Sequence, residues 1–255
     1  MTGGAGAIGW TLVVPVKAFS AAKTRLGPAV PAEARAALAR AFALDTITAA
    51  RAARGVERVI VVTGEVDLGS PLPAGVELVR EAPGVGDGPG GLTAAIDDGI
   101  RVARAGGLVP VAVLLGDLPS LRTSELEFAL EAASRHPLAF IADADGTGTT
   151  LATAAEGAPM RPAFGEQSAA RHREAGFADL AGDAPFASLR RDVDTIEALE
   201  QSLRLGVGAR TAETVAALAD GALPHTAFSP SSPQNPSNSQ NPPTHPTDPR
   251  RRSHP

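Results

Sequence analysis

Short apolar runs alternate with helix-forming stretches along most of this chain. This alternation is typical of an α/β fold, in which a mostly parallel sheet is flanked by helices. The apolar runs predict strands at residues 11–16, 58–63, 76–80, 109–115, 138–142 and 149–154. The stretches between and after them predict helices at residues 31–54, 91–105, 123–135, 167–175, 195–205 and 211–219. The first and fourth runs are almost wholly apolar, so we expect those strands to be covered on both faces.

The composition fits one such domain with extensions. Hydrophobic residues make up 44% of the 255 residues and aromatic residues only 4%, so Val, Leu, Ile and Ala must build the core. We expect a single domain at residues 10–225, after a flexible N-terminus at residues 1–9. Residues 226–255 are rich in Pro, Ser and Asn. Because such a segment buries too little apolar surface to repay its ordering, we expect a disordered tail.

Charge, cysteine content and hydropathy exclude several classes of protein. The net charge of −5 disfavours nonspecific binding to nucleic acid or to anionic membranes. The chain has no cysteine, which removes disulfides, thiolate catalysis and Cys-ligated zinc. No run of about 20 apolar residues is present to span a bilayer, and the N-terminus lacks a secretory signal pattern. We therefore expect a cytoplasmic protein with no nucleic-acid or membrane partner.

Three cations follow the first predicted strand. Lys17, Lys23 and Arg25 lie within nine residues of one another. Ligands of such sheets bind outside the carboxyl ends of the strands, so these cations are placed to neutralise a triphosphate. The alternative is an ordinary solvated loop. The segment has no G-x-x-x-x-G-K-[ST] pattern, which disfavours an ATPase of the P-loop class.

A glycine-rich stretch at residues 83–91 supports a rival interpretation. It contains G-x-G-x-x-G at Gly86, Gly88 and Gly91, the pattern of an NAD(P)-binding oxidoreductase. However, Glu81, Ala82 and Pro83 lie between the strand and the first glycine, and Pro89 lacks an N–H that could face a phosphate. A flexible loop over a nucleotide fits this stretch better, and a plain solvent loop stays open.

Two further segments contain acidic residues that could bind a metal ion. Asp117 comes directly after the most convincing buried strand, between Gly116 and a stiffening proline. Asp192 and Asp194 precede a predicted helix that Thr195 can cap, and in extended chain their side chains point to the same face. Carboxylate oxygens are the ligands that Mg²⁺ prefers. The three acids therefore predict a Mg²⁺ site, although each acid alone also fits a turn or a helix cap.

A third segment has the character of an anion site. Residues 143–151 combine glycines and hydroxyls after a strand, and residues 164–168 open a helix. Free N–H groups and a hydroxyl at such a position can bind a phosphate or a carboxylate. We assign no function to His172, because a lone histidine on a helix is usually a surface residue.

Taken in order, six short motifs resemble one known family. They are V-P-V-K, A-K-T-R-L, L-L-G-D-L-P, D-G-T-G-T-T, F-G-x-x-S and D-V-D-T, within residues 10–218. The chain resembles the 2-phospho-L-lactate and phosphoenolpyruvate guanylyltransferases of coenzyme F-420 biosynthesis. This resemblance implies a single Rossmann-like nucleotidyltransferase domain and a reaction between GTP and a phosphorylated three-carbon acid that releases pyrophosphate. It also implies a homodimer, although the sequence shows no interface.

The resemblance also implies a role for several individual residues of this sequence. Asp117, Asp192 and Asp194 match the Mg²⁺ ligands, and Lys17, Lys23 and Arg25 match the phosphate-facing cations. The acceptor positions are Thr150, Gly165 and Ser168, and the nucleotide positions are Gly90, Gly91, Leu92 and Thr93. The family often has asparagine where this chain has Thr93, which bears on guanine selectivity. The Ala-, Arg- and Gly-rich composition resembles that of high-GC actinobacterial chains, and the family members of that group are associated with phosphoenolpyruvate. The resemblance therefore implies phosphoenolpyruvate as the acceptor, giving enolpyruvyl-diphospho-guanosine, with 2-phospho-L-lactate and 3-phosphoglycerate as the alternative acceptors.

Overall fold

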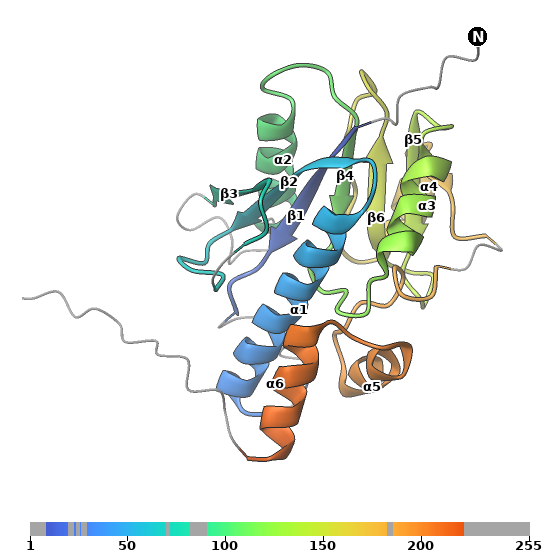
Figure 1. Cartoon of the computed structure of the whole chain (residues 1–255). Coiled ribbons are helices and arrows are strands. Elements are labelled where there is room, and N and C mark those ends of the chain that lie inside the picture. The colour runs from blue at the N-terminus through green and yellow to red at the C-terminus, as the bar shows by residue number, and fades with distance from the viewer. Residues whose placement is uncertain are drawn as a thin grey trace, which may run out of the picture. The chain divides into compact units, whose positions relative to one another are not determined.

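A seven-stranded sheet organises the described part of the chain (Figure 1). The computed structural model describes residues 9–19, 23, 26, 30–69, 72–81, 91–182 and 186–221. The strands, in sheet order, are β3 (Val76–Arg80), β2 (Val56–Thr63), β1 (Trp10–Val16), β4 (Val111–Leu114), β6 (Thr149–Ala154), β5 (Leu138–Ala142) and β7 (Ala178–Asp179). β3, β2, β1 and β4 are parallel, and β5 is parallel to β7. β6 runs antiparallel to both of its neighbours. The expectation of a mostly parallel sheet is thus confirmed.

Helices cover both faces of this sheet. They are α1 (Ala32–Ala52), α2 (Gly91–Ala103), α3 (Thr123–Ala133), α4 (Ser168–Glu174), α5 (Ile196–Leu205) and α6 (Ala209–Ala219). Figure 1 shows α2 and α1 on opposite sides of the strands. Side chains of α1 and α3 share one hydrophobic cluster, whereas those of α2 and α4 share another.

Alternating residues of the central strands feed these two clusters. Leu12 and Val14 of β1 belong to the cluster of α1 and α3, and Val13 belongs to the cluster of α2 and α4. All three side chains are fully buried. Because successive side chains of a strand point to opposite faces, a strand covered on both faces must be apolar at every position. This confirms the expectation for the first strand.

A third cluster joins the two ends of the domain. Leu38 and Phe42 of α1 pack with Val193, and partly buried residues of α6 lie against them. The carboxylate of Asp45 on α1 accepts the first N–H groups of α6, from Arg210 at 3.1 Å and Thr211 at 2.8 Å. This carboxylate therefore caps α6 from the other end of the domain.

Two further observations concern individual expectations. The hydroxyl of Thr195 accepts the N–H of Ala198 at 3.2 Å, which confirms the expected cap of α5. Within the described residues, no helix is both long and apolar enough to cross a membrane. The predicted N-terminal extension up to residue 8 and the predicted tail lie outside the described residues.

Candidate active site

A cavity of about 680 Å³ lies at the carboxyl ends of β1 and β4. Segments that follow β1, β4 and β5 line it, together with residues 164–168 and the two acids before α5. The predicted site residues that line this cavity are Lys17, Lys23, Leu92, Asp117, Gly165, Ser168, Asp192 and Asp194. The strand ends therefore gather most of the predicted residues in one place, as this type of sheet requires.

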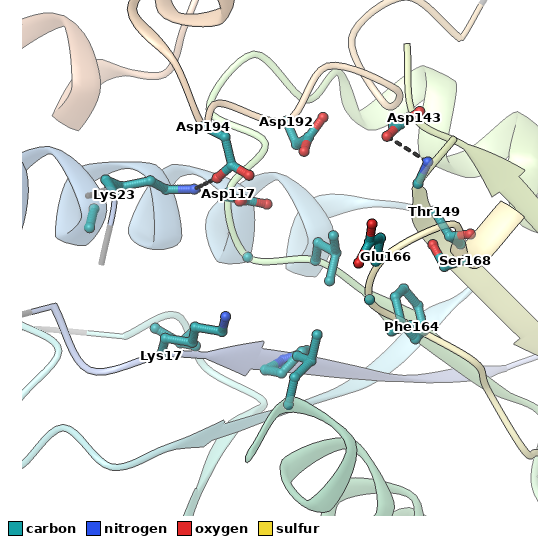
Figure 2. A pocket seen from close by; sticks show the side chains of 18 of the residues that line it. Lys17, Lys23, Asp117, Asp143, Thr149, Phe164, Glu166, Ser168, Asp192 and Asp194 are labelled. Atoms are coloured by element: carbon teal, nitrogen blue, oxygen red, sulfur yellow. Dashed lines mark hydrogen bonds and ion pairs between the residues drawn. The ribbon is translucent and has the colours of Figure 1, made fainter. Parts of the chain in front are cut away.

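Lys23 forms ion pairs with two of the predicted metal ligands. Its Nζ lies 2.5 Å from Oδ2 of Asp117 and 2.9 Å from Oδ1 of Asp194 (Figure 2). Burial alone would lower the pKa of Lys23, but the charges of Asp117 and Asp194 outweigh it and raise the pKa above its usual value. Lys23 is thus held fully protonated between the acids.

Asp192 lies beside these groups and experiences the excess of negative charge. Burial, together with the neighbouring charges of Asp117, Asp194 and Asp143, raises the pKa of Asp192 to about 7. One ammonium therefore does not neutralise the carboxylates gathered here. A carboxyl group with this pKa favours a further cation nearby.

The residues fit a divalent cation chemically. Oδ1 of Asp117 is buried and has no hydrogen-bonding partner among the described groups. An unpaired carboxylate oxygen in a crowd of acids suits a hard cation such as Mg²⁺. Within the described residues, however, no three acids or histidines surround a common point closely enough to form a metal site as they stand. The metal assignment of Asp117, Asp192 and Asp194 stays a prediction.

The loop that carries the two later acids is anchored at several points. Oε2 of Glu125 accepts two of its backbone N–H groups, from Ser188 at 2.9 Å and from Leu189 at 3.0 Å. Further along, the N–H of Val193 donates to the carbonyl of Asp117 at 3.1 Å, which joins the acid segments directly.

Arg190 provides a second anchor for the same loop. Its guanidinium donates to the carbonyls of Ala142 at 3.0 Å and Asp143 at 2.7 Å. The sequence interpretation missed both Arg190 and Glu125, because neither lies in a chemically suggestive motif. Their partners are backbone groups, which no side-chain pattern reveals.

The wall facing the acids is built from the third predicted segment. Figure 2 shows Phe164, Glu166 and Ser168 grouped near Thr149. Gly165, with φ 110°, adopts a backbone conformation that favours glycine. The side chain of Ser168 is buried at the edge of this wall.

Thr150 lies one position beyond this wall. Thr149 lines the cavity, whereas the hydroxyl of Thr150 is buried and has no hydrogen-bonding partner among the described residues. Because neighbouring residues of a strand face opposite ways, only one of the two side chains can reach the cavity. The predicted acceptor contact of Thr150 stays a prediction.

His172 was wrongly expected at the surface. Its ring is fully buried; Nδ1 lies 2.8 Å from the carbonyl of Ser168 and 3.0 Å from the hydroxyl of Thr149, and Nε2 accepts the N–H of Ala163 at 3.0 Å. Burial lowers the pKa of His172 to about 4, and the charge of Arg171 contributes to the decrease. The spacing of four residues from Ser168 was the available signal, because it places both residues on one face of a helix.

The described residues among the predicted nucleotide positions lie at the start of α2, and the predicted phosphate-facing cation Lys17 follows β1. Leu92 lines the cavity, Gly91 is buried as the first residue of α2, and Thr93 is exposed outside the lining. Lys17 is exposed and faces the cavity from the side opposite the acids (Figure 2). Gly90 and Arg25 lie outside the described residues.

A comparison with known families identifies the group of proteins to which this arrangement corresponds. The family described as "Guanylyl transferase CofC like" matches residues 10–218. This chain belongs to that family. The resemblance inferred from the six motifs is confirmed, and the NAD(P)-dependent alternative is left without support.

Curated relatives agree with the family. A phosphoenolpyruvate guanylyltransferase of Streptomyces coelicolor is 48% identical over 211 residues, which cover 82% of this chain and 97% of the relative. The enzyme of the same name from Salinispora arenicola is 44% identical over 206 residues, covering 80% and 92% of the two chains.

Solved structures share the fold at low sequence identity. A putative nucleotide-diphospho-sugar transferase from Desulfovibrio desulfuricans superimposes with a TM-score of 0.51 and 17% identity, covering 77% of this chain and 96% of that one. A Mycobacterium tuberculosis protein superimposes with a TM-score of 0.50 and 20% identity, covering 78% and 99%. The expected nucleotidyltransferase fold is confirmed.

Proposed function

We propose that this protein joins GTP to phosphoenolpyruvate, forming enolpyruvyl-diphospho-guanosine and releasing pyrophosphate. The observation that carries the proposal is that one cavity holds Asp117, Asp192 and Asp194 on one side and the glycine- and hydroxyl-rich wall on the other. The names of relatives with 44% and 48% identity support this choice of acceptor. 2-Phospho-L-lactate and 3-phosphoglycerate are the alternative acceptors of the same chemistry.

Mg²⁺ would be held by Asp117, Asp192 and Asp194. The unpaired Oδ1 of Asp117 and the raised pKa of Asp192 support a cation at this place. When bound, the ion neutralises charge on the triphosphate and on the departing pyrophosphate. Lys23 already contributes one positive charge between the acids, and Lys17 can approach the triphosphate from the other side.

Two walls would hold the organic parts of the substrates. We assign the phosphorylated acid to the wall containing Gly165 and Ser168, with Thr150 behind it, because the wall is rich in small and hydroxyl residues. We assign the nucleotide to the start of α2, where Leu92 provides an apolar contact for a ribose or base. Gly90, Gly91 and Thr93 complete the proposed nucleotide positions.

The chemistry needs alignment and charge neutralisation rather than a general base. A phosphate monoester has a second pKa of about 6, so the acceptor oxygen is already ionised at neutral pH. This oxygen attacks the α-phosphorus of GTP, and the bond from that phosphorus to the β-phosphate oxygen breaks as pyrophosphate leaves. Among the described residues no histidine lines the cavity, which agrees with this mechanism. Positioning the two substrates in line lowers the barrier, together with the charge neutralisation.

We further propose a cytoplasmic enzyme that acts on small molecules without nucleic-acid or membrane partners. The acidic balance of the chain, with a net charge of −5, supports this environment. A homodimer is the assembly we expect, and sedimentation of the purified chain tests it.

The test is pyrophosphate release from GTP with each of the three acids in the presence of Mg²⁺. We expect release with phosphoenolpyruvate and a loss of at least about a thousandfold in Asp117→Asn, since the ligand charge is removed. Asp220→Asn is the control, because Asp220 is an exposed acid outside the cavity lining and outside the six motifs. No release with any acid, together with tight NAD(P) binding, would overturn the proposal.

A further inference from the structure

We propose that His172 is a positioning residue that holds the acceptor wall of the cavity in its binding shape. The inference rests on the proposed function, because it concerns the wall to which we assign the phosphorylated acid. His172 itself does not line the cavity.

One imidazole ring connects three separate segments of this wall. Nε2 accepts from the N–H of Ala163, immediately before the wall residue Phe164. Nδ1 lies 2.8 Å from the carbonyl of Ser168, at the start of α4, and 3.0 Å from the hydroxyl of Thr149, on β6. Phe164, Ser168 and Thr149 all line the cavity, so the ring sets their relative positions from behind.

These partners also fix the tautomer of the ring. A backbone N–H can only donate, so Nε2 facing Ala163 must be unprotonated. A carbonyl can only accept, so Nδ1 must carry the proton that faces Ser168. His172 is therefore neutral, with its single proton on Nδ1, in agreement with a pKa of about 4.

The tautomer has a consequence for Thr149. Because Nδ1 carries the proton that faces Ser168, it has no lone pair to accept from Thr149, and the Thr149 hydroxyl can only share that proton as a second, more distant acceptor. Its own proton is then available for another acceptor, and no other hydrogen bond of this hydroxyl is formed within the described residues. Thr149 lines the cavity, so His172 leaves it as a donor for an oxyanion of the phosphorylated acid.

The wall needs such external support because its backbone is unusual. Gln167 adopts a left-handed conformation with φ 53°, which non-glycine residues rarely do, and Gly165 has φ 110°. The ring is held against its partners by Phe140, which stacks on it with ring centroids 5.4 Å apart, and by Phe164, which meets it edge-on with centroids 5.3 Å apart. A rigid neutral ring thereby holds a strained segment in place.

Two substitutions separate the two sides of the ring. His172→Gln can keep an acceptor near the position of Nε2 and loses the donor at Nδ1. His172→Asn can keep a donor near Nδ1 and loses the acceptor for Ala163. Phe177→Leu is the matched control, because it loosens the same aromatic cluster without removing any hydrogen bond and lies outside the cavity lining.

The measurements are KM for the acid, KM for GTP, and kcat, all from pyrophosphate release, with the melting temperature of each variant. We expect both His172 variants to raise KM for the acid at least about tenfold while KM for GTP changes less than about twofold. We expect Phe177→Leu to lower the melting temperature but to leave both KM values within about twofold.

The remaining outcomes decide against the inference. Equal changes in both KM values, or a KM for the acid that follows melting temperature in all three variants, would mean that His172 only stabilises the fold. If the His172 variants do not fold, Thr149→Val removes the hydroxyl while keeping the shape, and an unchanged KM for the acid would again refute it. A wild-type protein that uses none of the acids removes the proposed function and this inference together.

Discussion

Acidification is expected to destabilise this protein through His172. The ring is fully buried and accepts an N–H at Nε2, so protonation would place a charge in an apolar cluster and turn a hydrogen bond into a repulsion. Its pKa falls from 6.5 to about 4 on folding. A difference of about 2.5 pKa units corresponds to about 3 kcal/mol of unfolding free energy, at 1.36 kcal/mol per unit.

The direction follows from which state binds the proton. Above pH 6.5 the ring is neutral in both states and contributes nothing to the pH dependence. Between pH 6.5 and about 4 the unfolded chain takes up a proton that the folded protein rejects, so the free energy of unfolding falls as the pH falls. Below pH 4 both states are protonated and this loss stops growing.

Urea unfolding of the wild type and of His172→Gln isolates this contribution. The variant keeps the other four of the five histidines and every acid, so their titration cancels in the difference between the two proteins. We expect the wild type to lose about 3 kcal/mol more than the variant between pH 7 and pH 4. Parallel pH curves would refute the buried, neutral state of the ring.

Three further predictions concern the acids and their supports. Glu125→Ala should lower the free energy of unfolding by about 3 kcal/mol, because a charged acceptor of two backbone N–H groups is lost. Glu125→Gln should cost less than half of that, because its amide oxygen can replace Oε2. Equal losses for the two variants in urea unfolding would contradict this prediction. Lys23→Met should give a larger increase in melting temperature on adding Mg²⁺ than the wild type does, since it removes the cation that pairs with Asp117; equal increases would show that Lys23 and the metal do not compete for these acids. Thr195→Ala should cost about 1 kcal/mol as the cap of α5 is lost, with Thr195→Ser close to neutral in the same unfolding assay, and two equal losses would argue against the cap.

Strand positions were predictable where turn residues bound the apolar runs. The structure places β3, β5 and β6 at the predicted residues 76–80, 138–142 and 149–154. β4 is shorter than the predicted run 109–115, because Pro110 has no N–H to give to the ladder. β7 has only two residues, too few to produce a periodic pattern.

The antiparallel direction of β6 could have been predicted from the sequence, but we did not predict it. Only residues 143–148 connect β5 to β6, whereas parallel neighbours need a crossover of a dozen residues or more. A connection this short implies a hairpin, and the structure has one. The antiparallel strand brings Thr149 and the wall next to β4 and its acid.

The functional residues divide by the kind of information they require. Asp117 could be predicted because it follows the end of a strand, and Asp192 and Asp194 could be predicted from their spacing in the sequence. The pairing of Lys23 with Asp117 instead depends on which charges the fold brings together, and charge alone suggested a phosphate contact. His172 was misjudged because its burial comes from Phe140, Phe164 and Phe177, which lie on three different segments.

The packing of α6 on α1 means that this domain can complete its core only late in its synthesis. The hydrogen bond between Asp45 and Arg210 spans 165 residues, and the apolar surface of Leu38 and Phe42 is fully covered only after Val193, Leu199 and α6 have been made. Chains are synthesised from the N-terminus, so a growing chain carries this uncovered strip until nearly the whole domain has been made. The same late stretch delivers Asp192 and Asp194, which means that an interrupted chain has neither a closed core nor a complete set of acids.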